Sequence, residues 1–424
     1  MDGVERRPAR VKGAMADAEF YLDSLEMFGM RFGLERMRRL MTALDSPHER
    51  FRSIHVLGSN GKSSTVRMIA ELLERHGLRS GAYLSPHLAS WAERVELGTR
   101  PISDERFAAG IARVAEAAAL VDRTLDPGDR VTQFEALTAA AYWELARAGV
   151  EVAAVEAGLG GRYDATSVIR STVQVLTNVS LEHTRWLGPT ESHIAEEKLA
   201  VVPEGGIVVA GRLGAEALAV AERVAGERGA RLLLLGRDFD DPGVPLHPRG
   251  AFQRENFAVA VAAAEAFHGT LDPEHVRDAA QAVRTPGRLE VVARDPLTIL
   301  DGAHNPAGAH ALASALGEID EDRPVVGMMS VLDDKDASQM LGTLLPLFDE
   351  VVFTHSSRRG ALPAATLASL ARQLGGPVAH IEPSPRTALA RARELAGPGG
   401  AVLVTGSIYL LADLARDGAL GEQA

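Results

Sequence analysis

The chain has 424 residues, of which 46% are hydrophobic and 24% charged, and its net charge is −12. This length predicts two or three domains, and the acidic balance with only 5% aromatic residues argues against a nucleic-acid-binding protein. The absence of cysteine excludes disulfides, thiolate zinc sites and cysteine nucleophiles. We expect a cytoplasmic protein without a membrane span, because no run approaches roughly 18 apolar residues and residues 1–12 lack the apolar core of a secretory signal.

Short β-like runs alternate with helical stretches rich in alanine and leucine, which predicts a parallel α/β architecture. In the first part of the chain we expect helices at 104–120 and 134–148, among others, and strands at 53–57, 81–84, 150–156, 172–178 and 206–210. A loop-rich piece at 238–250 precedes a helix from Phe252. A second series of strands begins after Pro296, at 297–300, 325–330, 350–354, 378–381 and 401–405. The turn-prone Thr285-Pro286-Gly287 divides the series, so we expect domains at 1–284 and 285–424.

The segment Gly58-Ser59-Asn60-Gly61-Lys62-Ser63-Ser64 is the most informative motif in the chain. It follows an apolar run and opens a helical pattern, the order in which a glycine-rich loop cradles the phosphates of a nucleotide. Backbone N–H groups would face the anion, and Lys62 would reach the terminal phosphates. The common spacing G-x-x-x-x-G-K-[ST] needs a glycine where Val56 stands, so the motif is a shorter form of the loop.

Polar residues follow several other predicted strands, where functional residues gather in parallel α/β sheets. Ser85-Pro86-His87 follows one strand, and Glu156 ends another, ahead of a stretch with three glycines between 158 and 161. A buried unpaired carboxylate is costly, so Glu156 predicts either a magnesium ion on ATP phosphates or a salt bridge to Arg162. The three glycines predict either a tight turn or backbone close to a ligand.

Other candidates have equally plain structural alternatives. His183, in Glu182-His183-Thr184, is either a ligand or a buried structural histidine, and Lys198 is either functional or part of a solvated helix face. Asp301 and His304 stand on a turn that could be an Asx turn before a helix. The phosphate loop favours the functional alternatives, because phosphoryl transfer needs a metal-binding carboxylate and cations around one point.

Taken together, the motifs resemble folylpolyglutamate synthase, including its bifunctional dihydrofolate synthase form, within the Mur ligase superfamily. The resemblance covers nearly the whole chain. The matching stretches are 33–36, 58–64, 85–88 with 93–94, 132–135, 156–166, 182–184 with 186–188, 197–198, 253–256, 286–288, 301–306, 334–336 and 405–407.

The resemblance implies a P-loop ATP-binding domain with a parallel-type central sheet, a smaller α/β C-terminal domain and an active site between the two. It also implies ATP-driven amide formation, in which a folate-type carboxylate becomes an acyl phosphate that the amine of L-glutamate then attacks. The implied partners are ATP, one or two Mg²⁺ ions, L-glutamate and a folate or dihydropteroate. The family suggests a monomer.

The resemblance also implies residue roles. The nucleotide site comprises Gly58, Ser59, Asn60, Gly61, Lys62, Ser63, Ser64, Asn256, Arg288 and Asp301. Ser85, Glu156 and His183 would bind magnesium, and Lys198 matches a carbamylated lysine facing a second metal. His304 and Ser407 would handle glutamate, and the catalytic set is Lys62, Lys198, His183 and His304. The folate site would comprise Arg31, Phe32, Gly33, Thr132, Gln133, Phe134, Glu135, Tyr163, Asp164 and Ala165.

The chain departs from the family pattern at several positions. Ser63 replaces a glycine, so either Ser63 or Ser64 could contact the nucleotide, while Ser85 is the expected hydroxyl ligand of magnesium. Glu182 replaces an aspartate, Ser167 an asparagine and Leu199 an alanine. Arg31 stands where dihydropteroate-using members can carry an acidic residue, which favours folate. The alternatives are a Mur-type ligase for another carboxylate and a non-catalytic nucleotide-binding protein.

Overall fold

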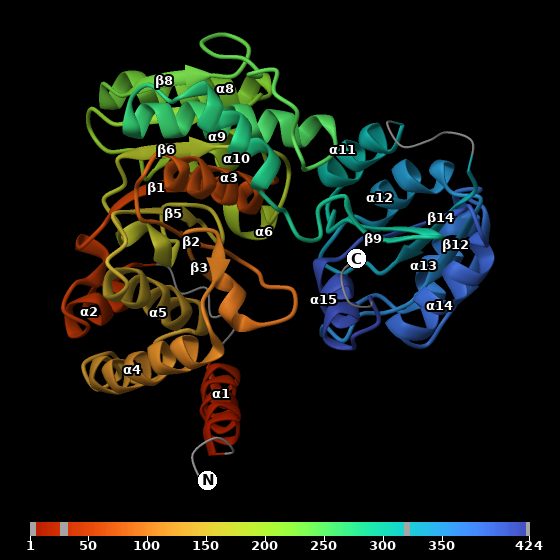
Figure 1. The fold of residues 1–424 in the computed structure, drawn as a ribbon, viewed down its shortest axis with the longest axis horizontal. Coiled ribbons are helices and arrows are strands. Elements are labelled where there is room, and N and C mark those ends of the chain that lie inside the picture. The colour runs from red at the N-terminus through yellow and green to blue at the C-terminus, as the bar shows by residue number, and fades with distance from the viewer. Residues whose placement is uncertain (1–5, 26–32, 318–322, 421–424) are drawn as a thin grey trace. The chain divides into compact units, whose positions relative to one another are not determined.

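The computed structural model describes residues 6–25, 33–317 and 323–420, and for residues 6–12 only the backbone (Figure 1). Arg31 and Phe32, expected in the folate site, lie outside the described residues. The chain forms two compact units. The first comprises residues up to His87, Trp91–Pro245 and Glu255–Val283, and the second comprises Leu88–Ser90, Leu246–Arg254 and the chain from Arg284 onward.

The first unit is built on an eight-stranded sheet in the order β4-β3-β2-β5-β1-β6-β7-β8. All pairings are parallel except those of β3 with β2 and β4. The strands are β1 (Arg52–Leu57), β2 (Ser80–Tyr83), β3 (Val95–Leu97), β4 (Arg100–Pro101), β5 (Val152–Glu156), β6 (Val173–Leu176), β7 (Ile207–Ala210) and β8 (Arg231–Leu234). The central strand β5 is buried along its whole length, as expected of a parallel strand covered on both faces.

Helices cover both faces of this sheet. Figure 1 shows α3 and α10 on one side of β1 and β5, and α4 and α5 on the other. The α-helices are α1 (Arg6–Ser24), α2 (Glu35–Ala43), α3 (Lys62–Arg75), α4 (Asp104–Asp122), α5 (Gln133–Arg147), α6 (Thr184–Leu187), α7 (Glu191–Leu199), α8 (Ala215–Arg228), α9 (Ala251–His268, its first turn in the second unit) and α10 (Pro273–Ala282). Short 3₁₀ helices are η1 (Pro47–Glu49), η2 (Trp91–Arg94) and η3 (Ala165–Val168).

The second unit has a six-stranded sheet in the order β13-β12-β11-β14-β10-β9. Its strands are β9 (Glu290–Arg294), β10 (Leu297–Leu300), β11 (Val325–Met329), β12 (Glu350–Phe353), β13 (Val378–Ile381) and β14 (Ala401–Thr405). Only β9 is antiparallel to its neighbour. The helices are α11 (Pro306–Leu316), α12 (Ala337–Leu344), η4 (Leu345–Leu347), α13 (Ala364–Gln373), α14 (Pro385–Ala396) and α15 (Ile408–Arg416).

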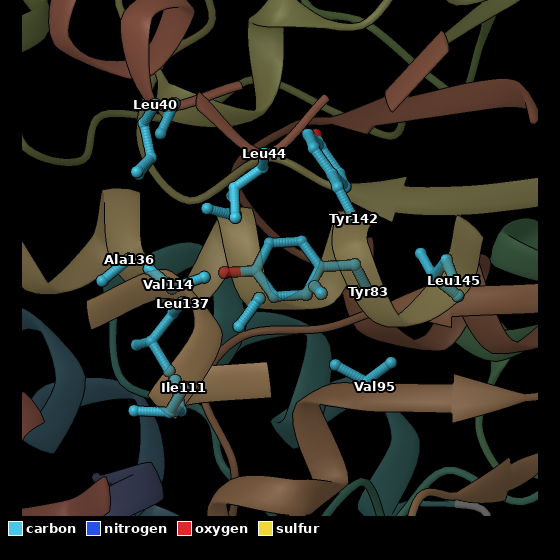
Figure 2. Packing of buried hydrophobic residues seen from close by; sticks show 14 of the residues in the cluster. Leu40, Leu44, Tyr83, Val95, Ile111, Val114, Ala136, Leu137, Tyr142 and Leu145 are labelled. Carbon is cyan, nitrogen blue, oxygen red and sulfur yellow. The ribbon is translucent and has the colours of Figure 1, made fainter. Parts of the chain in front are cut away.

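A large apolar cluster of the first unit joins β2 and β5 to α1, α2, α4 and α5. Tyr83 lies at its centre, among Leu44, Val95 and Leu137 (Figure 2). Its ring is fully buried, and its hydroxyl pairs with Thr138 Oγ1 at 3.1 Å. Burying a side chain of this size contributes about 2 kcal/mol. This cluster therefore fixes the strand whose end leads to Ser85.

The predicted fold class is confirmed. Both series of parallel strands are present, and the expected strands at 378–381 and 401–405 coincide with β13 and β14. The antiparallel additions β3, β4 and β9 were not predicted. In the part of the chain that the structure describes, no helix is long and apolar enough to cross a membrane.

Candidate active site

Four strand ends of the first unit meet at one edge of the sheet. The order β2-β5-β1-β6 places the carboxyl ends of these parallel strands side by side, and Val56 of β1 pairs with Glu156 of β5. Four parts of the chain therefore lie at this edge: Ser85, Glu156, the phosphate loop and residues 177–183. This is where parallel α/β sheets bind their ligands.

The phosphate loop links β1 to α3 and is held against the end of β6. Asn60 donates its backbone N–H to Asn178 Oδ1 at 2.9 Å, and its carbonyl oxygen accepts from Thr177 Oγ1 at 2.6 Å. Gly58 and Gly61 have φ values of 143° and 81°, and a Cβ on either would overlap the side chains of Thr177 and Asn256 respectively. Both positions therefore require glycine. Asn256 lies beside the loop, next to Gly61.

Thr177 and Asn178 were not among the predicted site residues, although both shape the loop. Their signal was in the sequence, because they directly follow the apolar run of β6. Thr177 is buried, and its Oγ1 also approaches the carbonyl oxygen of Leu57 at 3.3 Å. The side-chain amide of Asn178 binds both backbone groups of Asn60: its Oδ1 accepts the N–H, and its Nδ2 donates to the carbonyl oxygen at 3.2 Å. The loop conformation thus depends on β6 as much as on its own glycines.

Two lysines converge on the phosphate loop. Lys62 Nζ donates to the carbonyl oxygens of Gly58 and Ser59, at 2.9 and 3.1 Å. Lys198 Nζ donates to the same Gly58 carbonyl oxygen at 2.9 Å and to Glu182 Oε1 at 3.1 Å. Lys198 is only 2% exposed, so the alternative of a solvated helix face is wrong. Two basic side chains at this edge of the sheet therefore donate to the same carbonyl oxygen, that of Gly58.

The Lys198–Glu182 pair is strongly perturbed. Burial would raise the pKa of Glu182, but Lys198, Lys62 and His183 outweigh it and hold that pKa at about 2. Burial, reinforced by the charge of Lys62, lowers the pKa of Lys198 in spite of its carboxylate partner. The carboxylate of Glu182 is thus ionised at neutral pH. Because its pKa is lowered, Lys198 loses its proton more readily than a surface lysine does.

Glu156 lies between two serines. Its Oε1 accepts from Ser63 Oγ at 2.9 Å, and its Oε2 accepts from the Ser85 backbone N–H at 3.0 Å. The predicted alternative, a salt bridge to Arg162, is wrong, because Arg162 pairs with Glu197 at 2.8 Å. Glu156 is 2% exposed. Ser64 is also buried, whereas Ser63 is half-buried and is the serine that reaches the carboxylate.

These oxygens fit a magnesium site. Mg²⁺ commonly takes one or two protein oxygens together with phosphate oxygens and waters. Among the residues described, no three His, Cys, Asp or Glu side chains gather closely enough to hold a metal by themselves. The oxygens that the structure brings together here are those of the Glu156 carboxylate and the Ser63 hydroxyl. His183 stands at the N-cap position of α6 in a left-handed conformation with φ of 48°, which is uncommon for residues other than glycine and is often found at functional sites.

The residues expected to bind folate fall into two groups, apart from Gly33, which is half-buried just before α2. Thr132 and Glu135 form a capping box at the start of α5. Glu135 also pairs with Arg36 at 3.1 Å, and the Gln133 amide donates to the carbonyl oxygen of Leu22 at 2.9 Å. These three side chains are buried and hold α5 in place. The structure thus gives them packing roles that the sequence did not predict.

The second group lies in the loop after β5. Tyr163 is 47% exposed, whereas Asp164 and Ala165 are buried. The carboxylate of Asp164 points into its own loop, where Oδ2 accepts the Leu159 backbone N–H at 2.7 Å. Phe134 packs over Gly158, where a Cβ would lie 2.5 Å from the ring. Tyr163 is therefore the exposed hydrophobic side chain of this loop, Phe134 of α5 packs against Gly158, and Asp164 supports the loop from within.

In the second unit, the pairing of β10 with β14 gathers the remaining predicted residues. Asp301 donates its backbone N–H to Val404, and Gly406 donates to Ala303. Asp301 Oδ1 accepts the Ala303 backbone N–H at 2.8 Å, so the predicted alternative of an Asx turn is confirmed, and Pro306 starts α11 as expected. Burial raises the pKa of Asp301, and nearby Arg288 opposes that rise. His304 Nδ1 lies 2.9 Å from the carbonyl oxygen of Gly302. Ser407 is buried and caps α15.

Comparisons with known proteins agree with this geometry. Residues 287–408 match the family model described as Mur ligase, glutamate ligase domain. The chain is 38% identical to a dihydrofolate synthase/folylpolyglutamate synthase of Mycobacterium tuberculosis, over 81% of this chain and 78% of the relative. The chain belongs to the folylpolyglutamate synthase/dihydrofolate synthase family. It also matches, at 36% identity over 94% of its length, a probable bifunctional folylpolyglutamate synthase/dihydropteroate synthase of Haloferax volcanii, but it spans only 50% of that relative.

Solved structures of the folylpolyglutamate synthase family have the same fold. The Mycobacterium tuberculosis synthase solved with ADP and AMPPCP has a TM-score of 0.90 and 33% identity, covering 97% of this chain and 99% of that chain. A bifunctional Yersinia pestis enzyme solved with AMPPNP and a Mn ion has a TM-score of 0.84 and 29% identity, covering 95% and 97%. A folylpolyglutamate synthase complex with AMPPCP and folate has a TM-score of 0.82 and 30% identity, covering 95% and 99%. Family membership assigns the chain to the ATP-dependent ligases, and the predicted resemblance is confirmed.

Proposed function

We propose that the protein adds L-glutamate to the side-chain carboxylate of a reduced folate, with ATP as the source of energy. Dihydropteroate is the second candidate acceptor. The observation that carries the proposal is the meeting of the short phosphate loop, Glu156 and Lys198 at one edge of the sheet. A phosphate cradle, a carboxylate and basic groups around one point are what transfer of a γ-phosphoryl group requires.

The proposed reaction has two steps. A carboxylate oxygen of the folate attacks the γ-phosphorus of ATP, the bond to ADP breaks, and an acyl phosphate forms. The amine of glutamate then attacks the acyl carbon, loses a proton, and displaces phosphate as the amide bond forms. A free carboxylate is a poor acyl donor because its oxygen leaves badly, and phosphorylation supplies the leaving group. Both steps concentrate negative charge that must be stabilised by groups already in place.

Lys62 and the backbone N–H groups of residues 58–64 would neutralise that charge. Lys62 is held by two loop carbonyl oxygens, and it would exchange them for phosphate oxygens when the nucleotide binds. Glu156, with Ser85, would hold Mg²⁺, which would supply positive charge to stabilise the negative charge of the phosphates. Ser63 supports this site through its hydrogen bond to Glu156. Asn256, Arg288 and Asp301 would complete the nucleotide site.

Carbamylation of Lys198 would convert it into an anion able to face a second metal, and we include it in the proposal. The lowered pKa of Lys198 supports this, because only the neutral amine reacts with carbon dioxide. The opposing factor is Glu182, whose ionised carboxylate would repel a carbamate at the present distance of 3.1 Å. Carbamylation therefore requires Lys198 to move away from Glu182. His183 would bind metal, and His304 and Ser407 would handle glutamate.

The proposed folate site centres on Tyr163 and Phe134, with the segment from Arg31 to Gly33. An omission assay tests the overall proposal. Purified protein with ATP, Mg²⁺, glutamate and tetrahydrofolate should release phosphate only when all four are present. Phosphate release that is unaffected by omitting tetrahydrofolate would reject the ligase assignment, and a parallel assay with dihydropteroate decides between the two acceptors.

A further inference from the structure

A buried chain of hydrogen bonds links the strand that leads into the phosphate loop with the loop that carries Tyr163. His55, on β1, is 1% exposed, and its Nε2 lies 2.8 Å from Thr166 Oγ1. Thr166 is completely buried, and its Oγ1 lies 2.5 Å from Asp164 Oδ1. Three polar side chains in an apolar interior thus satisfy one another. Such a network is costly to break, because any member left alone is a buried unpaired polar group.

Asp164 organises the whole turn after β5. Its Oδ2 accepts the Leu159 backbone N–H at 2.7 Å, and its Oδ1 accepts the Thr166 backbone N–H at 3.0 Å. Its own N–H donates to the carbonyl oxygen of Gly161. The carboxylate therefore connects both ends of segment 159–166. Because the segment contains Gly160 and Gly161 and directly follows Gly158, it has little intrinsic stiffness and depends on this support.

The direction of the hydrogen bonds follows from the number of protons. The hydroxyl of Thr166 has a single proton, which it donates to the Asp164 carboxylate. It must then accept from His55, so the imidazole carries its proton on Nε2. Burial lowers the pKa of His55 to about 4, which keeps the ring neutral at physiological pH.

The same turn contacts the other parts of the site. Tyr163 is its exposed large hydrophobic side chain, and Gly158 packs against Phe134. Arg162 is bound to Glu197 by its backbone N–H and by its side chain at 2.8 Å, directly before Lys198. Two residues beyond His55, β1 ends and the phosphate loop begins. Movement of the turn relative to β1 would therefore shift Tyr163 relative to the phosphate loop.

We propose that His55, Thr166 and Asp164, together the loop anchor, are positioning residues that hold the turn 157–163 against β1, so that the carboxylate-bearing substrate is aligned with the bound nucleotide. The inference rests on the proposed function, and it assigns Asp164 a role inside the loop in place of the substrate contact that the sequence predicted. Loss of the loop anchor would therefore misplace the substrate relative to the nucleotide, while the conformation of the phosphate loop would not change.

The test uses the full chain with Thr166→Val, which removes the hydroxyl at nearly constant volume, and Thr166→Ser, which keeps it. Thr298→Val, in the second unit, is the matched control, since Thr298 is also fully buried and bonds a backbone carbonyl oxygen. We expect Thr166→Val to speed hydrogen exchange of residues 157–166 by about 10-fold and to raise the KM for tetrahydrofolate by about 10-fold. ADP affinity should stay within about 2-fold, as expected if the phosphate loop is untouched. Thr166→Ser and Thr298→Val should behave like the wild type.

Unchanged exchange in segment 157–166 would overturn the proposal, as would an equal loss of ADP and folate binding, which indicates general damage. Exchange is measured without substrates, so it does not depend on the enzymatic assignment. A wild type that does not ligate folate but shows the expected exchange pattern would refute the proposed function alone. Should Thr166→Val not fold, the wild type still decides, because the Leu159 amide must be protected, and a rapidly exchanging Leu159 would contradict the anchor.

Discussion

Lys198 and Glu182 form a buried ion pair, and we expect stability to depend on it. The side chains are 2% and 6% exposed. Removing one partner of such a pair leaves a buried charge without compensation and typically costs about 3–5 kcal/mol. We expect Glu182→Gln to lower the free energy of unfolding by roughly this amount, measured by denaturant titration at pH 7. Glu196→Gln, on the helix α7 that carries Lys198, is the control, because its partner Arg223 is exposed and the pair contributes less than about 1 kcal/mol. Equal effects of the two variants would contradict this account.

Lys198 itself should be needed for turnover. We expect Lys198→Ala to lower the rate of phosphate release by about 100-fold or more, because it removes a charge that acts where the phosphoryl group is transferred. ADP binding, measured by titration, should persist. Partial rescue by a small added carboxylate would support the carbamate role. A wild-type rate in the variant would refute that role.

The lowered pKa of His55 should make the stability of the folded protein depend on pH. Its pKa is about 4 in the folded protein and about 6.5 in the unfolded chain. Between these values the unfolded chain binds a proton that the folded protein does not, so stability is lost as pH falls from about 6.5 to 4, by up to about 3 kcal/mol. His55→Gln, which keeps an N–H donor but does not titrate, should flatten this part of the curve. The measurement is a series of urea titrations, and identical curves for both proteins would show that His55 does not titrate as stated.

At single positions, the sequence predicted which residues stand at strand ends but not what they contact. Glu156 and Ser85 were predicted together, and the structure brings them together. The predicted salt bridge between Arg162 and Glu156 was wrong. Arg162 pairs with Glu197 of α7 instead, and such a pair depends on how α7 packs against the loop. The buried roles of Thr132, Glu135 and Asp164 were likewise invisible, since they depend on long-range packing.

At the scale of elements, the strand–loop–helix unit from β1 to α3 was predictable because its glycines and lysine are local signals. The hairpin of β3 and β4 was not, because strands of three and two residues show no periodicity. Strand β9 was not predicted either. The structure pairs it antiparallel to β10, because only two residues connect the two strands and a parallel crossover needs a much longer connection.

The start of α5 gives a prediction for an element. Thr132 accepts from the Glu135 backbone N–H and also contacts the Glu135 carboxylate at 3.0 Å. Ser103 caps α4 through a single bond to the Arg106 N–H at a more exposed position. Because Thr132→Ala loses two buried contacts, we expect it to cost about 2 kcal/mol, against about 1 kcal/mol for Ser103→Ala. Thermal unfolding of the two variants measures the difference, and a larger effect at Ser103 would contradict the ranking.

At the scale of the whole molecule, the sequence showed two series of strands and the break near residue 285. The domain limits 1–284 and 285–424 stay a prediction, as do the monomeric state and the cytoplasmic location. The short segments 88–90 and 246–254 belong to the second unit by their contacts. Composition gave no sign of this, because only contacts distant in sequence assign such segments. The residues proposed to bind the folate are equally distant in sequence, since Arg31 and Tyr163 lie on separate segments.

The central claim is that ATP activates a folate carboxylate as an acyl phosphate, and one measurement tests it most directly. Tetrahydrofolate labelled with ¹⁸O in its side-chain carboxylate is incubated with the protein, ATP, Mg²⁺ and glutamate, and both products are analysed by mass spectrometry. The account predicts a folate longer by one glutamyl residue and one ¹⁸O atom transferred to the released phosphate. Unlabelled phosphate, or phosphate released without a lengthened folate, would contradict it.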